Sequence, residues 1–157
     1  MSERWLGIDY GDVRIGLAVS DELAFLAHPT ATLPNDGSAV ASIRELVIQR
    51  KVAGIVVGIP RNMNGTFGPS AEKAKKFGEE LRKQLPEQRL VFWDERLTTA
   101  EAQRVLHGVG KNTKSSRPVL DQVAAQIILQ SYLDSLQLAL PERELDNTDD
   151  PSGDAML

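Results

Sequence analysis

Two short segments near the start of the chain alternate between apolar residues and polar or small ones. Residues 6–9 (LGID) and 15–20 (IGLAVS) repeat every two positions, which is the period of a strand with one buried face. The residues between them, 10–14 (YGDVR), have the length of a hairpin connection. The pattern therefore predicts an antiparallel pair of strands.

Three later segments predict further strands. Residues 25–33 contain Pro29 and precede Pro34, so we expect an edge strand there, because proline cannot donate a backbone hydrogen bond to a neighbour. Residues 53–59 (AGIVVGI) form a continuous apolar run, which is typical of a strand covered on both faces. Residues 90–93 (LVFW) predict another buried strand.

The segments between these strands repeat apolar residues every three or four positions, the period of a helix with one buried face. We expect Asp36 to cap the first helix and Ser70 to cap the second. Thr98 and Glu101 have the spacing of a capping box at the start of a third. A fourth helix is expected over residues 117–138.

An antiparallel start followed by strands that alternate with helices predicts an α/β fold. The expected architecture is a mixed sheet, in which an antiparallel β-meander precedes parallel strands, with helices on both faces. Residues 1–140 form one domain in this interpretation. Residues 141–157 are rich in Asp, Glu, Pro, Ser and Gly, and we expect an acidic, disordered tail.

Composition narrows the classes of protein that fit. The chain of 157 residues has no cysteine, which excludes a disulfide scaffold, a thiolate zinc site and a cysteine nucleophile. No apolar run approaches the ~18 residues of a membrane helix, so we expect a cytoplasmic protein that does not contact a membrane.

The net charge of −4 is unevenly distributed. Residues 141–157 hold six acidic residues and one basic residue, so residues 1–140 hold 17 basic and 16 acidic ones. The body is therefore nearly neutral, and the negative charge lies in the tail.

Carboxylates follow the predicted strands and open the last predicted helix. Asp9 ends the first strand, Asp94 and Glu95 follow the strand at 90–93, and Asp121 lies at the start of the final helix. Functional groups of open α/β sheets gather at the carboxyl ends of strands. Oxygen ligands without His or Cys suit Mg²⁺ or Mn²⁺, and two such ions can support phosphodiester cleavage. From spacing alone, a helix cap or a surface charge explains each carboxylate equally well.

Two segments are candidates for binding a nucleic-acid backbone. The loop at 60–69 offers Arg61, Asn62 and Asn64 as phosphate ligands. Residues 102–120 contain no acidic residue and lead directly to Asp121. The candidate nucleic-acid-binding residues are Arg61, Asn62, Asn64, Arg96, Lys111, Lys114 and Arg117. Basic residues between 73 and 83 alternate with Glu, so a solvated helix face is expected there.

Four motifs together resemble one bacterial family. The stretches GIDYGDVRIGLAVSD (7–21), GIPRNMNGTFGPSA (58–71), WDERLTTAEA (93–102) and LDQVAAQIILQSYL (120–133) are similar to the YqgF family. Its members are identified as pre-16S rRNA nucleases and also as Holliday junction resolvases with a ribonuclease H-like fold. The resemblance covers about residues 4–138, and the acidic tail lies outside it.

This resemblance implies a metal-dependent nuclease in which Asp9, Glu95 and Asp121 match the acidic triad. Asp94 remains an alternative to Glu95 as the middle ligand. The implied cofactor is Mg²⁺ or Mn²⁺ in a two-metal site. The implied role is 5′-end processing of pre-16S rRNA, with ribosomal precursor particles as partners; resolution of branched DNA is the alternative, and monomer and homodimer both stay open.

A protein of another class also fits part of the pattern. The hairpin with Asp9 and Gly11 resembles the first phosphate loop of actin-like ATPases, but those proteins need two such domains and this chain supplies one. A non-catalytic RNA-binding protein is the third alternative, and it would not require the set of carboxylates.

Overall fold

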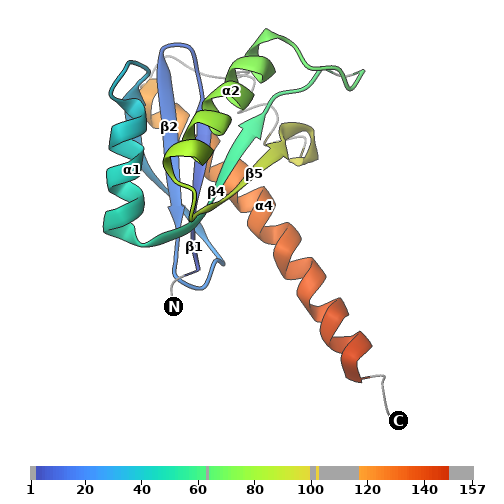
Figure 1. The fold of residues 1–157 in the computed structure, drawn as a ribbon. Helices are drawn as coiled ribbons and strands as arrows, with labels where there is room; N and C mark the ends of the chain where they lie inside the picture. Colours follow the sequence, from blue (N-terminus) through green and yellow to red (C-terminus); the bar gives the residue numbers. More distant parts are fainter. Residues whose placement is uncertain (1–2, 63, 100–101, 103–116, 149–157) are drawn as a thin grey trace.

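The computed structural model describes residues 3–62, 64–99, 102 and 117–148, with side chains described up to residue 138. Within these residues it contains a five-stranded sheet and the helices that cover it (Figure 1). The elements are β1 (Arg4–Tyr10), β2 (Arg14–Ser20), β3 (Ala27–Pro34), α1 (Ala39–Arg50), β4 (Val52–Ile59), α2 (Pro69–Gln84), β5 (Arg89–Asp94), the 3₁₀ helix η1 (Glu95–Leu97) and α4 (Arg117–Thr148).

The sheet is mixed, in the order β3-β2-β1-β4-β5. β2 pairs antiparallel with both β1 and β3, whereas β4 pairs parallel with β1 and with β5. The predicted fold class, an antiparallel meander followed by parallel strands, is therefore confirmed. β3 is an edge strand, as its two prolines predicted.

β5 differs from its prediction. Residues 90–93 were expected to form a buried strand, but β5 is the second edge strand and its residues are only partly buried. A short apolar run predicts burial but contains no information about which strands will flank it.

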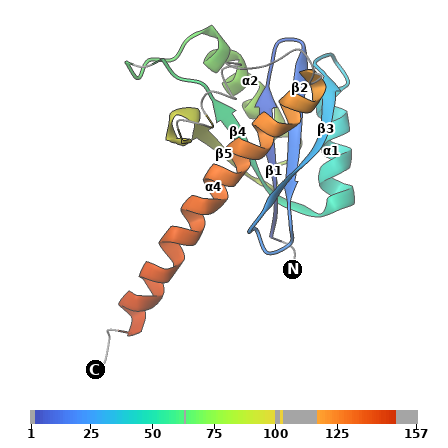
Figure 2. The ribbon, with the colours of Figure 1, turned by 180° about the vertical axis from the view of Figure 1, so that it is seen from behind.

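Helices cover both faces of the sheet, α1 and α2 on one side and α4 on the other (Figures 1 and 2). Leu6 and Ile8 of β1 belong to the core beneath α1 and α2. Trp5 belongs to the second core, together with Ala125 and Leu129 of α4. Alternate residues of β1 therefore serve opposite layers, as the period of two requires.

Small residues let α4 lie directly against the sheet. Gly7 pairs with Ala18, and Asp9 pairs with Gly16. A Cβ placed at Gly7 would come within 2.6 Å of the Leu129 Cβ. One placed at Gly16 would overlap the carbonyl oxygen of Asp121. Glycine at these positions thus fixes how closely the helix approaches, and it brings Asp121 to the strand pair that carries Asp9.

Two predicted helix starts are shifted along the chain. Gly68, not Ser70, is the N-cap of α2, and Pro69 occupies the first turn, where its missing N–H costs nothing. Ser38 stands at the N-cap of α1, and Asp36 accepts hydrogen bonds from the Ser38 backbone N–H and hydroxyl. Thr99 accepts a hydrogen bond from the Ala102 backbone N–H, whereas Glu101 of the predicted capping box and nearly all of the third predicted helix lie outside the described residues.

α4 extends beyond its predicted end at Leu138 to Thr148. The segment after Pro141 contains Glu, Arg and Leu, which favour helix. Residues 141–148 thus continue α4, the expected disorder of the tail stays a prediction, and 149–157 lie outside the described residues. Among the described helices, none has the length and apolarity to cross a membrane.

Candidate active site

Asp9 lies near the end of β1, on the face that α4 covers. Trp5 and Gly7 contact α4 residues from this face, and Asp9 follows them at the same period of two. Tyr10, the next residue, points the other way and packs against the ring of Phe77 on α2. The strand pairing with Gly16 leaves a side of Asp9 without a bulky neighbour in β2.

Asp121 comes from the first turns of α4 and reaches the same strand pair. Its backbone lies against Gly16, the residue opposite Asp9. Its carboxylate accepts a hydrogen bond from Arg14 Nε at 2.6 Å, and the Asp121 side chain is 17% exposed. Arg14 was not among the predicted site residues, because nothing in the sequence pattern links residues 107 positions apart.

Glu95 is a buried carboxylate beside Asp9. It is the first residue of η1, directly after β5, and the residue is 7% exposed. Its Oε2 lies 3.0 Å from the position that a Cβ of Gly58 would take, next to Ile128 of α4. Burial, together with the negative charges of Asp9 and Asp94, raises the pKa of Glu95 to about 8.

The three predicted carboxylates thus gather on the α4 face, but they do not form a closed metal site. No three His, Cys, Asp or Glu side chains within the described residues are arranged to hold a metal ion. Asp121 is held by Arg14 instead. The repulsion between Asp9 and Glu95 nevertheless fits a divalent cation, because a cation between carboxylates replaces repulsion with attraction.

Asp94 faces the other side of the sheet. Phe92, two residues earlier, packs in the core beneath α2, whereas Trp93 packs beside α4. Asp94 binds Arg96 at 2.9 Å and Arg61 at 3.2 Å. Burial alone would raise the pKa of Asp94, but the hydrogen bonds and positive charges of the arginines outweigh it and hold this pKa below its usual value.

The loop at 60–69 is held by its own polar side chains. Arg61 donates from Nε and Nη2 to the Gly65 carbonyl oxygen. Asn64 accepts from the backbone and hydroxyl of Thr66, and Asn62 donates to that hydroxyl at 2.9 Å. The two asparagines predicted to bind phosphate therefore stabilise the turn.

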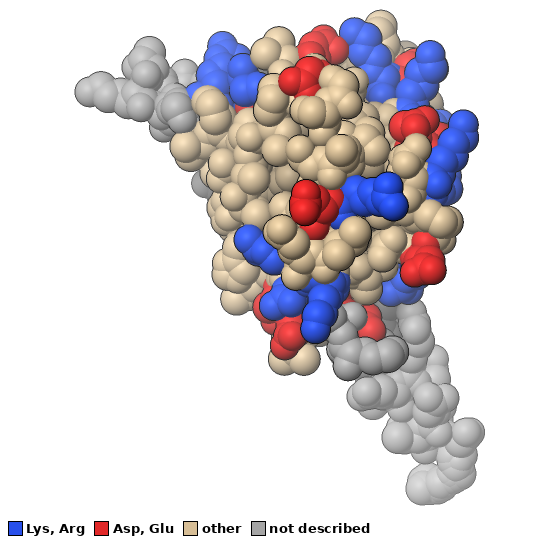
Figure 3. Space-filling view, turned by 60° about the vertical axis from the view of Figure 1, so that its left-hand side comes forward, with Lys and Arg blue, Asp and Glu red and all other residues tan. Residues whose placement is uncertain are grey.

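The other predicted nucleic-acid-binding residues are only partly described. Arg117 is exposed at the start of α4, whereas Lys111 and Lys114 lie outside the described residues. On the face drawn in Figure 3, the described Lys and Arg are interspersed with Asp and Glu. This agrees with the solvated helix face predicted between residues 73 and 83, where Arg82 pairs with Glu79 at 2.7 Å.

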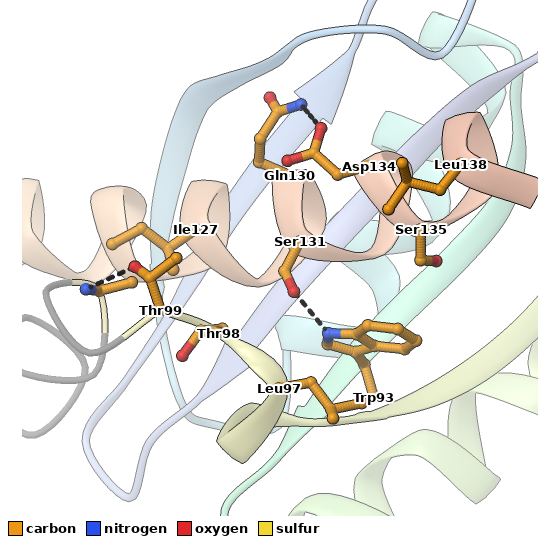
Figure 4. Close-up of a pocket in the computed structure, with 11 residues that line it drawn as sticks. Trp93, Leu97, Thr98, Thr99, Ile127, Gln130, Ser131, Asp134, Ser135 and Leu138 are labelled. Atoms are coloured by element: carbon orange, nitrogen blue, oxygen red, sulfur yellow. Dashed lines mark hydrogen bonds between the residues drawn. The ribbon is translucent and has the colours of Figure 1, made fainter.

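A hollow of about 510 Å³ lies between α4 and the end of β5. Its polar groups bind one another: Trp93 Nε1 donates to Ser131 Oγ at 3.0 Å, and Gln130 donates to Asp134 (Figure 4). The remaining lining is largely apolar and includes the exposed Leu97 and Leu138. The described lining does not include Asp9, Glu95 or Asp121, so the candidate chemistry lies elsewhere.

Comparisons with known proteins identify the family to which this chain is similar. A family profile described as "RuvX: Holliday junction resolvase" matches residues 3–135. A protein of Caldanaerobacter subterraneus named "Putative pre-16S rRNA nuclease" is 47% identical over 137 residues, covering 84% of this chain and 96% of that protein. A protein of the same name from Halalkalibacterium halodurans is 42% identical over 139 residues, covering 86% and 99%.

Solved structures share the fold at low sequence identity. Thermus thermophilus RuvC superposes with a TM-score of 0.55 at 14% identity, covering 85% of this chain and 96% of that one. The fowlpox virus Holliday junction resolvase superposes with a TM-score of 0.51 at 12% identity, covering 84% and 99%. The mixed sheet described above is therefore the fold of these ribonuclease H-like proteins.

Proposed function

The chain belongs to the RuvX family and is a nuclease, and we propose that it hydrolyses phosphodiester bonds with divalent metal ions held by Asp9, Glu95 and Asp121. Mg²⁺ and Mn²⁺ suit this set of oxygen ligands. When bound, the metal ions would activate water and stabilise the leaving oxygen.

The observation that carries this proposal is the burial of Glu95 beside Asp9. Burying the Glu95 carboxylate next to the negative charge of Asp9 is costly without a cation, and this cost shows in the raised pKa of Glu95. Such perturbed groups concentrate at functional sites. A cation at this position is the simplest reason for a nuclease to keep the arrangement.

The chain contributes position and charge. Asp9 stands on β1, the central strand of the sheet, and pairs with Gly16 of β2. α4 brings in Asp121, which would hold a metal ion, and Arg14 donates a hydrogen bond to that carboxylate. Arg61, Arg96 and Arg117, together with Lys111 and Lys114, are proposed to bind the phosphate backbone of the substrate.

We favour RNA as the substrate, with 5′-end processing of pre-16S rRNA as the role. The names of the two relatives support this choice. Precursor particles of the ribosome would then be the partners, and the site of action the cytoplasm. The description of the family profile favours a second candidate, cleavage of Holliday junction DNA.

The test is cleavage measured side by side on precursor 16S rRNA, single-stranded RNA and a four-way DNA junction, each with Mn²⁺ and with EDTA. We expect cleavage of the precursor only with Mn²⁺, and none by Glu95→Gln. Cleavage of the junction alone would show that the substrate is branched DNA and not precursor rRNA. Equal cleavage in EDTA, or by Glu95→Gln, would refute the metal-dependent mechanism.

A further inference from the structure

Asp94 joins two arginines from separate segments of the chain. Its carboxylate accepts hydrogen bonds from Arg96 Nε and Nη2 and from Arg61 Nη1, and the Arg96 backbone N–H donates to it at 2.9 Å. Arg61 follows β4 and Arg96 follows β5, which are neighbouring parallel strands. We call Arg61 and Arg96 the arginine pair.

Arg61 is fixed more firmly than an ordinary surface arginine. Besides Asp94, it binds the Gly65 carbonyl oxygen twice, and its guanidinium lies 4.5 Å from the centre of the Phe67 ring. Lys75 of α2 lies 4.8 Å from the same ring. An arginine held in place by several contacts loses little entropy when it binds a ligand, so it is prepared for recognition.

The turn at Gly65 leaves space in front of both guanidinium groups. Gly65 has a φ of +88°, a conformation that favours glycine. A Cβ built there would lie 3.8 Å from Arg61 Nη2 and also 3.8 Å from Arg96 Nη1. Both guanidinium groups thus lie on the same side of Gly65, and no side chain of residue 65 covers them.

The arginine pair keeps positive charge and donors for a ligand. Two guanidinium groups on one carboxylate leave a net charge of +1. Each Nη of Arg61 carries two hydrogens and donates one bond within the described residues, so a second hydrogen remains on each. The side chains of Arg61 and Arg96 are 29% and 39% exposed, so a ligand can reach them.

We propose that the arginine pair binds a phosphate group next to the scissile one, and that Asp94 is the positioning residue that holds the pair in place. This inference rests on the proposed nuclease function. Asp94 and Glu95 are adjacent, but their carboxylates lie on opposite faces of the sheet. A bound strand would therefore cross the end of β5, from the carboxylates on the α4 face to the arginine pair on the α2 face.

The test measures binding of a labelled single-stranded RNA in EDTA, by fluorescence anisotropy at several KCl concentrations. Removing an acidic side chain normally strengthens binding to a polyanion. For Asp94→Asn we expect the reverse, an RNA affinity about tenfold lower. The reason is that the charged hydrogen bonds between residue 94 and the two arginines are lost. Arg96→Ala should flatten the log–log salt slope by ~0.7, the value for one phosphate on a single strand.

A double variant tests whether the two arginines share one phosphate. Arg61→Ala with Arg96→Ala should flatten the slope by ~0.7 in total, not twice that amount, because the same phosphate is lost once. The matched controls are Arg82→Ala and Glu79→Gln, from an exposed ion pair on α2. Arg82→Ala removes one positive charge and Glu79→Gln removes one negative charge, both away from the arginine pair. We expect an unchanged salt slope for these variants.

Two results would overturn this proposal. One is an unchanged salt slope in Arg96→Ala, which remains informative if Asp94→Asn does not fold. The other is a loss of Mn²⁺ binding in Asp94→Asn as large as in Glu95→Gln, measured by calorimetry, which would make Asp94 a metal ligand. Failure of the nuclease function would show separately, as wild-type protein that binds RNA with the expected slopes but does not cleave it.

Discussion

Asp94 and Glu95 are neighbours in the chain, and the end of β5 sends their carboxylates to different environments. Asp94 binds Arg61 and Arg96, and its pKa lies below its usual value. Glu95 is buried near Asp9, and its pKa is raised. Environments that separate the pKa values of two carboxylates also separate their roles. This contrast favours Glu95 as the metal ligand and Asp94 as the residue that orders the arginines.

Arg14 Nε donates a hydrogen bond to the carboxylate of Asp121, so removing Arg14 should affect metal binding directly. We expect Arg14→Gln to bind Mn²⁺ several-fold more tightly, because the metal no longer has to displace a hydrogen bond of 2.6 Å. The metal-free variant should be less stable by about 1–3 kcal/mol, since Asp121 loses a charged partner. Calorimetric titration and thermal unfolding measure the two effects. Weaker Mn²⁺ binding would show instead that Arg14 orients Asp121 for the metal.

Contact between α4 and the glycines of β1 and β2 gives a test at the level of elements. A Cβ in Gly16→Ala would overlap the Asp121 carbonyl, so α4 must shift just where it carries Asp121. We expect a loss of about 1–3 kcal/mol in stability from overpacking, together with a large loss of cleavage.

Gly7→Ala is the matched control for this prediction. Its Cβ would meet Leu129, on the same helix but two turns farther from Asp121. Stability should fall by a similar amount, while the protein that remains folded should cleave better than Gly16→Ala does. Equal specific activities of the two folded variants would show that the fit of α4 at Gly16 does not position the site.

The connection between β2 and β3 gives a prediction about pH. Asp21 accepts hydrogen bonds from the backbone N–H groups of Phe25 and Leu26, and its pKa is lowered, chiefly by the bond from Leu26. A lowered pKa adds stability above the ordinary pKa, and this stability is lost as the pH falls through the folded-state value.

Asp21→Asn should therefore be less stable than wild type at pH 7, by up to ~1 kcal/mol for this exposed turn. The difference should shrink as the pH falls below the ordinary aspartate pKa of 3.8. Urea unfolding at several pH values provides the measurement. A difference that stayed constant from pH 7 into strong acid would mean that the charge of Asp21 does not stabilise the turn.

Local patterns predicted the local features of this fold. The period of two in β1 and β2 predicted their pairing, which is present. The place of Asp121 near the start of α4 was also predicted, and Ala124 and Ala125 are buried where α4 packs against the sheet. The ion pair of Arg14 with Asp121 could not be predicted, since it depends on how two segments that are distant in the sequence meet. The same holds for the edge position of β5.

At the scale of the whole molecule, charge is divided between a nearly neutral body and an acidic end. The described packing of α4 against the body reaches Leu136, and the later part of the helix points away from the sheet (Figures 1 and 2). Deleting residues 141–157 removes six acidic residues and one basic residue, which changes the net charge from −4 to +1.

We expect this deletion to leave the melting temperature nearly unchanged and the RNA affinity equal or higher, because a nearby negative charge repels the substrate. Anisotropy at low salt gives the affinity, and any gain should fade as salt screens the charges. A marked fall in affinity would show that the end of the chain takes part in binding.

The central claim is that Asp9 holds the metal ions that this nuclease uses. The most direct measurement is the rate of Mn²⁺-dependent cleavage of precursor 16S rRNA by wild type and by Asp9→Asn, after both are shown to be folded. We predict a loss of more than ~100-fold, at least the cost of losing a residue that supports a metal ligand, with an unfolding temperature no lower than that of the metal-free wild type. Folded Asp9→Asn protein that cleaves at the wild-type rate would contradict the claim.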